Sequence, residues 1–131
     1  LPILTADNTG MNLVFALSYG GRQEITDMVR KATKMARDGE LSPEEIDEAT
    51  VARLMPSCFL PDPDLIIRTS GESRLSNFFL WQAAYSEIHF EQKPWPEFTT
   101  LDLKNILEHF SKRERRFGRT SDQVEDHGRQ L

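Results

Sequence analysis

Two arginines and several hydroxyl side chains gather in a short loop near the middle of the chain. The run Leu65–Ile67 is apolar and follows Pro63 and Asp64, a pattern that indicates a short buried strand. Directly after it come Arg68, Thr69, Ser70, Gly71 and Arg74. Guanidinium groups pair bidentately with phosphate oxygens, and loops that follow the strands of α/β sheets are common anion sites. The loop therefore predicts a phosphate or diphosphate site.

Arg68 stands immediately after the apolar run, where its charge would be partly desolvated. A buried, unpaired charge is costly, so Arg68 needs a carboxylate such as Glu72 or a bound anion. Ser76 and Asn77 introduce an apolar stretch, and we expect a helix over Ser76–Tyr85 whose N-terminus would also favour phosphate. The alternative is a structural Arg68–Glu72 pair with Ser76 as an ordinary N-cap, and spacing alone favours neither.

Three strings in this chain resemble motifs of one enzyme family. Residues 67–90, IRTSGESRLSNFFLWQAAYSEIHF, resemble the signature region of the cis-prenyltransferases, the family of undecaprenyl diphosphate synthase. Residues 16–22, ALSYGGR, and residues 113–118, RERRFG, resemble two further family motifs in the family's order. We expect residues 1–118 to form the C-terminal part of such a domain, followed by a polar, disordered tail over residues 119–131.

Strands that alternate with helices along the chain indicate an α/β fold with a parallel sheet and flanking helices. Three strands are expected, at Met11–Tyr19, around Leu65–Ile67 and at Ser86–Phe90. Four helices are expected, at about Arg22–Arg37, Ser42–Met55, Ser76–Tyr85 and Leu101–Arg116. The resemblance implies the undecaprenyl diphosphate synthase-like fold, of which these elements would be a C-terminal portion.

The composition excludes some classes of protein. A formal net charge of −5 argues against a general nucleic-acid binder. The one cysteine, Cys58, cannot form an internal disulfide, which favours a reducing compartment, and we expect it to be a small buried apolar residue of a cytoplasmic protein. The sequence contains no apolar run near the roughly 20 residues that span a bilayer.

The resemblance also implies a reaction. In this family, isopentenyl diphosphate is added to an allylic diphosphate such as farnesyl diphosphate, with cis geometry, while Mg²⁺ assists the departure of the allylic diphosphate. The product would be a long-chain polyprenyl diphosphate such as undecaprenyl diphosphate. By motif match, Arg68, Arg74 and Ser76 would bind isopentenyl diphosphate, with the backbone at Leu75 nearby.

Further residues match family positions near the end of the chain. Glu87 matches a glutamate that contributes to Mg²⁺ binding, and Mg²⁺ accepts one carboxylate when water and phosphate oxygens complete its shell. Without the resemblance, Glu87 would be an ordinary surface carboxylate. Arg116 and Gly118 match a motif that reaches the partner's substrate phosphates in a homodimer. The alternative is a cluster of cations at a helix C-terminus, which the helix dipole favours.

One family motif does not occur in this sequence. The family's Asp-Gly-Asn-Gly-Arg-Trp loop carries its principal catalytic and Mg²⁺-binding aspartate, and no such string is present. We therefore expect the C-terminal half of a cis-prenyltransferase, inactive alone and with no catalytic residue to assign. The resemblance also implies peripheral membrane association through the lipid product. Alternatives are a noncatalytic accessory subunit of a heteromeric cis-prenyltransferase, or an unrelated anion-binding α/β module. The intact arginine loop favours the enzyme over the accessory subunit, and three ordered motifs disfavour the unrelated module.

Overall fold

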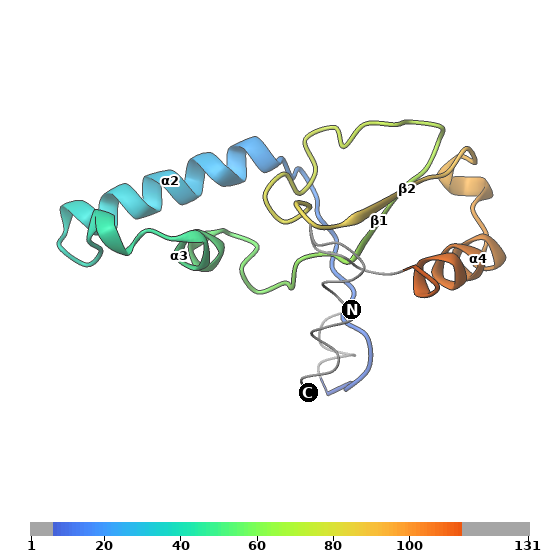
Figure 1. The fold of residues 1–131 in the computed structure, drawn as a ribbon, viewed down its shortest axis with the longest axis horizontal. Helices are drawn as coiled ribbons and strands as arrows, with labels where there is room; N and C mark the ends of the chain where they lie inside the picture. The colour runs from blue at the N-terminus through green and yellow to red at the C-terminus, as the bar shows by residue number, and fades with distance from the viewer. Residues whose placement is uncertain (1–6, 114–131) are drawn as a thin grey trace, which may run out of the picture.

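The computed structural model describes residues 7–113, whose helices flank a small central sheet (Figure 1). Helices α2 and α3 lie side by side at one end, the strands β1 and β2 lie in the middle, and α4 lies at the other end. In chain order the elements are α2 (Gly21–Arg37), a 3₁₀ turn (Pro43–Glu45), α3 (Glu48–Leu54), β1 (Leu65–Arg68), β2 (Glu87–Phe90), a 3₁₀ turn (Trp95–Glu97) and α4 (Thr100–Ser111). The predicted α/β class is confirmed.

The main core lies between α2 and α3. Apolar residues of α2 recur at helical spacing, so one face of the helix is apolar and is buried against α3. The buried members of this core are Met28, Ala32, Leu41, Leu54 and Met55, with Ile25, Met35, Val51 and Trp81 packed against them. The predicted helix Arg22–Arg37 is confirmed to within one residue at its start.

The predicted helix Ser42–Met55 is divided in two. A capping box is present at its start, where the Ser42 backbone N–H donates to the Glu45 carboxylate at 2.7 Å. However, the chain becomes extended at Ile46, and Asp47 caps a new helix by accepting from the Thr50 N–H at 2.7 Å. A second strong N-cap so close to the first ends one helical turn and starts α3.

The sheet has two parallel strands, in which Leu65 lies opposite Glu87 and Arg68 opposite Phe90. The predicted strands at 65–67 and 86–90 are confirmed, but the predicted strand Met11–Tyr19 is wrong for this structure. Residues 11–17 have no regular structure, and Met11 and Leu17 are 89% and 85% exposed. A strand needs a hydrogen-bonded neighbour, and within residues 7–113 only β1 and β2 are paired.

The segment from Ser76 to Tyr85 forms successive turns, so the helix predicted there is wrong. Ser76, Asn77 and Phe79 have φ angles of 49°, 66° and 45°. These angles lie in the left-handed region, which a right-handed helix cannot include. Tertiary contacts of this segment, described below, hold it in that conformation.

Helix α4 begins where the sequence predicted. Thr99 caps it, and Asp102 completes a capping box by accepting from the Thr99 N–H at 2.8 Å. Hydrogen bonds from Lys93 and Thr99 lower the pKa of Asp102 to about 2. Ile106 is the buried member of this helix, which ends at Ser111 and not at the predicted Arg116, a residue outside the described part of the chain.

Cys58 is exposed, so the prediction of a buried cysteine is wrong. It lies in the turn that follows α3, where its neighbour Ser57 makes the inward hydrogen bonds instead. Among residues 7–113, none of the helices has the length and apolar character needed to cross a bilayer.

Candidate functional site

Arg68 is the last residue of β1 and is half-buried. Its Nε is shielded from solvent and has no hydrogen-bond partner. The alternative Arg68–Glu72 pair is absent, because Glu72 binds Arg74 at 2.7 Å and none of the ion pairs within residues 7–113 includes Arg68. A shielded, unpaired donor typically costs about 1–3 kcal/mol. Arg68 is therefore the residue that an anion would satisfy.

The loop after Arg68 is tied at its start to the segment that follows β2. The Ser70 N–H donates to the Lys93 carbonyl at 2.9 Å, and the Gly71 N–H donates to the Glu91 carbonyl at 2.9 Å. These two N–H groups are therefore occupied by protein carbonyls and are not available to an anion. Gly71 has φ +67°, and an added Cβ would lie 2.9 Å from the Gln92 side-chain oxygen.

The loop is tied at its other end to the first turn of α2 through Asn77. The Gly21 N–H donates to the Asn77 carbonyl at 2.7 Å, and the Arg22 N–H donates to Asn77 Oδ1 at 2.8 Å. Asn77 thus satisfies two of the N–H groups that a helix start leaves free, since Gly20 supplies no side-chain cap. A Cβ on Gly20 would lie 2.8 Å from Asn77 Nδ2, which explains the paired glycines at this contact.

These contacts change the predicted anion site in two ways. No helix begins at Ser76, so its N-terminus cannot contribute, and the first N–H groups of α2 are occupied by Asn77. The role of Asn77 was not predicted from the sequence. The available signal was its residue type, because asparagine adopts left-handed backbone angles more readily than most residues.

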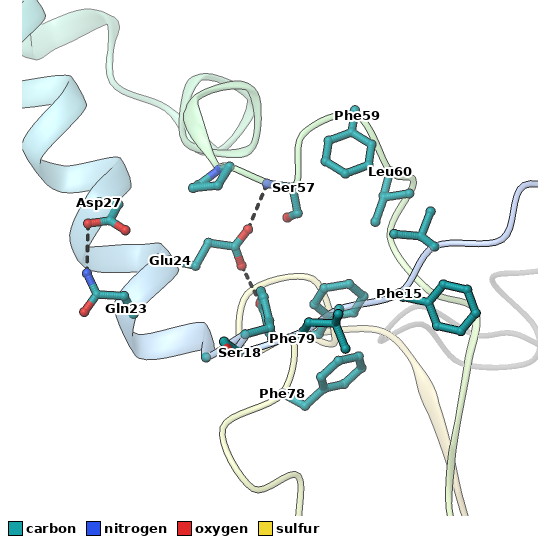
Figure 2. Close-up of a pocket in the computed structure, with 16 residues that line it drawn as sticks. Phe15, Ser18, Gln23, Glu24, Asp27, Ser57, Phe59, Leu60, Phe78 and Phe79 are labelled. Atoms are coloured by element: carbon teal, nitrogen blue, oxygen red, sulfur yellow. Dashed lines mark hydrogen bonds between the residues drawn. The ribbon is translucent and has the colours of Figure 1, made fainter. Parts of the chain in front are cut away.

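Glu24 forms a second tie between the same regions. It is only 4% exposed, and its carboxylate accepts a hydrogen bond from the Ser57 N–H at 2.9 Å (Figure 2). It also accepts hydrogen bonds from Gln82 Nε2 at 2.9 Å and from the Tyr19 hydroxyl. Burial alone would raise the pKa of Glu24, but these hydrogen bonds together outweigh burial and lower it. Burial and the bond to Glu24 raise the pKa of Tyr19. At neutral pH the network therefore contains an ionised Glu24 and a protonated Tyr19.

The role of Glu24 was not predicted from the sequence either. Its only local signal was position, because it is a charged residue within the apolar stripe of α2, one residue before Ile25 and four before Met28. Acidic residues in a first helical turn are common for reasons of the helix dipole alone. Its partner Gln82 lies 58 residues away in the sequence, so the network could not be inferred locally.

An apolar cavity of about 500 Å³ opens beside this network. Side chains from the segment before α2, from the turn after α3 and from the 76–85 segment point into it (Figure 2). Its aromatic members are Phe15, Tyr19, Phe59, Phe78 and Phe79. Glu24 and Asp27 also line it, whereas no lysine or arginine occurs among its described lining residues. The volume suits a small ligand, and the lining suits a hydrocarbon better than a diphosphate.

The remaining predicted binding residues are divided between described and undescribed parts of the chain. Arg74 is exposed and paired with Glu72, Leu75 is half-buried, and Ser76 is exposed. They lie in the same loop as Arg68. Arg116 and Gly118 lie outside the described residues.

Glu87, the predicted metal ligand, lies at the start of β2, opposite Leu65. It is three residues from Phe90, the partner of Arg68, and is therefore displaced by about 10 Å along the strands from the loop. Its Oε1 contacts Arg113 Nη1 at 2.5 Å. No group of three or more metal-binding side chains occurs among residues 7–113, so Glu87 fits Mg²⁺ only if phosphate and water supply the other ligands.

The chain is similar in sequence to known prenyltransferases. The family model described as "Putative undecaprenyl diphosphate synthase" matches residues 3–118. The isoprenyl transferase of Porphyromonas gingivalis is 49% identical over 120 residues, which cover 92% of this chain and 47% of the relative. A tritrans,polycis-undecaprenyl-diphosphate synthase (geranylgeranyl-diphosphate specific) of Methanopyrus kandleri is 56% identical over 104 residues, which cover 79% of this chain and 38% of the relative.

Solved structures give the same result. Lavandulyl diphosphate synthase from Lavandula x intermedia, in complex with dimethylallyl diphosphate, has a TM-score of 0.83 and 42% identity over 88% of this chain and 50% of that one. A "probable undecaprenyl diphosphate synthase" from Campylobacter jejuni has a TM-score of 0.64 and 34% identity over 79% of this chain and 46% of that one. The chain belongs to the undecaprenyl diphosphate synthase family of cis-prenyltransferases, and it spans about half the length of the relatives it matches.

Proposed function

We propose that this chain binds isopentenyl diphosphate as part of a cis-prenyltransferase that condenses it with an allylic diphosphate such as farnesyl diphosphate. A long-chain polyprenyl diphosphate, such as undecaprenyl diphosphate, is the proposed product. The observation that carries this proposal is the shielded and unpaired Nε of Arg68 in a loop that also contains Arg74. Family membership supports the proposal, and so do the prenyl diphosphates in the names of relatives.

The loop and the cavity differ in charge, so they suit different parts of a prenyl diphosphate. The diphosphate would bind Arg68 and Arg74, with Ser76 and the backbone at Leu75 beside it. Arg74 can exchange Glu72 for phosphate at little cost, because exposed ion pairs contribute little. The cavity, which has two carboxylates and aromatic walls, would repel the diphosphate and accept a hydrocarbon chain.

We also propose that Glu87 contributes to Mg²⁺ binding. When bound, Mg²⁺ would neutralise negative charge on a departing diphosphate. Glu87 would have to leave Arg113 or share its carboxylate with it. Arg116 and Gly118 are proposed to contact substrate phosphates across a homodimer, in a cytoplasmic protein whose lipid product could bring it to the membrane surface.

The sequence lacks the family's Asp-Gly-Asn-Gly-Arg-Trp motif, and we propose that these 131 residues do not catalyse condensation by themselves. A noncatalytic accessory subunit remains the alternative. The two functions differ in what the chain binds. A catalytic-type half binds isopentenyl diphosphate through Arg68, whereas an accessory subunit raises the activity of a separate catalytic chain without that binding.

The test is an NMR titration of the chain with isopentenyl diphosphate, inorganic pyrophosphate and isopentenol. The two diphosphates should give saturable shifts over residues 68–76, and isopentenol should leave those residues unchanged because it lacks the charged group. Arg37→Ala is a matched control for Arg74→Ala, because both arginines form exposed ion pairs. The Arg37–Asp38 distance is 2.8 Å with Arg37 72% exposed, and the Arg74–Glu72 distance is 2.7 Å with Arg74 70% exposed. Absence of saturable shifts from the folded chain would contradict the proposal.

A further inference from the structure

We propose that Glu24 is a positioning residue that holds the diphosphate-binding loop in its binding conformation. This inference rests on the proposed function of the loop. Glu24 touches neither Arg68 nor Arg74 in any recorded contact, so it would act through the segment that follows them. Its carboxylate joins Tyr19, Ser57 and Gln82, which come from three separate parts of the chain.

The loop's geometry depends on both of its ends. Its first end is fixed by backbone hydrogen bonds from Ser70 and Gly71 to residues 91–93. Its second end runs into the left-handed turn at Ser76 and Asn77, and this conformation is costly for Ser76 unless surrounding contacts stabilise it. The position of Leu75 and Ser76 is therefore set by whatever holds the turn.

Helix α2 holds that turn at two points. Asn77 binds the N–H groups of Gly21 and Arg22, and Gln82 binds Glu24 one helical turn further along. The segment between Asn77 and Gln82 is thereby fixed to the first turn of α2 at both of its ends. Loss of the Glu24–Gln82 bond would leave Asn77 as the remaining side-chain tie between them within the described residues.

A carboxylate suits this position better than an amide. Three donors converge on Glu24, and a carboxylate accepts all of them because it has two acceptor oxygens and no hydrogen. A glutamine would offer one acceptor oxygen and would direct its amide hydrogens at a donor. Without a flip of the Gln82 amide, the amide group of the new glutamine would face Gln82 Nε2, and two donors would oppose each other. With a flip, Gln82 Nε2 would leave Ser57 Oγ, which it contacts at 2.5 Å, and would take the buried, unpaired place of Oε1. One buried donor would remain unpaired with or without the flip.

The residue Asp27 offers an internal comparison. It lies on the same helix and lines the same cavity, but it is partly exposed and binds Gln23 and Arg30 of its own helix. It has no recorded tie to the 76–85 segment. Asp27→Asn therefore removes a negative charge from the cavity wall without affecting the support of the loop.

The experiment measures dissociation constants for pyrophosphate and isopentenyl diphosphate, from amide shifts of residues 68–76, alongside the melting temperature of each variant. Glu24→Gln should weaken binding about tenfold and shift the Asn77 amide, since a buried donor loses its partner. The double variant Glu24→Gln with Gln82→Glu restores a donor–acceptor pair and should recover most of the affinity. The α4 cap variant Thr99→Ala should bind as the unsubstituted chain does, and Asp27→Asn should not weaken binding, because it removes only a negative charge from the cavity wall.

The outcomes separate this inference from the proposed function. If the unsubstituted chain binds neither diphosphate, the proposed function fails and this inference fails with it. If that chain binds but folded Glu24→Gln binds equally well, or if the double variant recovers nothing, only the positioning role is overturned. Should Glu24→Gln not fold, Gln82→Met removes one tie and leaves the carboxylate two donors; about threefold weaker binding is expected, and unchanged binding would overturn the inference.

Discussion

Glu24 in α2 and Arg68 at the end of β1 both carry charge into the protein, but their polar atoms are satisfied differently. Glu24 is 4% exposed and accepts three hydrogen bonds from the surrounding chain. Arg68 has a shielded Nε without a partner. A buried charge that the fold satisfies fixes segments relative to one another, whereas one that the fold leaves unsatisfied indicates where a ligand of opposite charge binds.

The helical region that contains Glu24 and the sheet region that contains Arg68 also differ in packing. The α2–α3 region contains the five residues of the buried core, whereas the strands and α4 bury Ile66 and Ile106 among the described hydrophobic residues. Stability should therefore depend mainly on the helical region, and ligand binding on the loop after β1. Each of the following predictions tests one side of that division.

The largest effect is expected in the helical core. Leu54→Ala should lower the free energy of unfolding by about 2–5 kcal/mol, because it removes a buried side chain and leaves a cavity. Leu107→Ala on α4 is the control; Leu107 is half-exposed, and its loss should cost less than about 1 kcal/mol. Urea denaturation measures both. Equal losses would contradict the division between the regions.

Arg68→Met should weaken diphosphate binding roughly ten- to hundredfold, since it removes a charged hydrogen-bond donor worth about 1.5–3 kcal/mol. The free energy of unfolding should stay the same or rise, because the substitution also removes the shielded, unpaired Nε. Calorimetric titration and urea denaturation of the same sample measure the two quantities. A variant that loses stability while retaining affinity would mean that Arg68 is structural.

The pH dependence of the free energy of unfolding should reflect the ionisation of Glu24. Since its pKa is lowered on folding from the ordinary 4.5, Glu24 contributes stability that is complete above that value and is lost as pH falls through the folded pKa. The difference in unfolding free energy between the unsubstituted chain and Glu24→Gln should thus be constant near neutral pH and shrink in acid. A difference that grows in acid would show that the pKa is raised instead.

The smallest effect is expected for Arg74→Ala. Arg74 is 70% exposed, so its contribution to diphosphate binding is screened by water, and about two- to fivefold weaker binding is expected. Stability should change by less than about 0.5 kcal/mol. A loss as large as that of Arg68→Met would show that both arginines are desolvated in the complex.

Elements with local signals were predictable from the sequence. Helix α2 has a clear apolar stripe, β1 and β2 have short apolar or alternating runs, and Thr99 is a cap residue three positions before Asp102. The motif resemblance predicted the family, which the comparisons confirm. It also named Arg68, whose unpaired Nε fits the predicted role without testing it.

The features that the sequence did not predict depend on distant partners. The apolar run over Ser76–Tyr85 suits a helix, but Asn77 binds residues about 55 positions away and keeps the segment in turns. The run Met11–Tyr19 suits a strand, but within the described residues it has no strand neighbour. Glu24 was missed because its importance arises from Ser57 and Gln82, which are remote in sequence.

The central claim is that the unpaired Nε of Arg68 binds a diphosphate, and NMR of the arginine Nε–H groups tests it most directly. Addition of isopentenyl diphosphate should shift the Arg68 Nε–H signal and slow its exchange with water, with the same dissociation constant as the shifts over residues 68–76. The Arg37 signal should not change. Saturable binding that leaves the Arg68 Nε–H signal unchanged would contradict the claim.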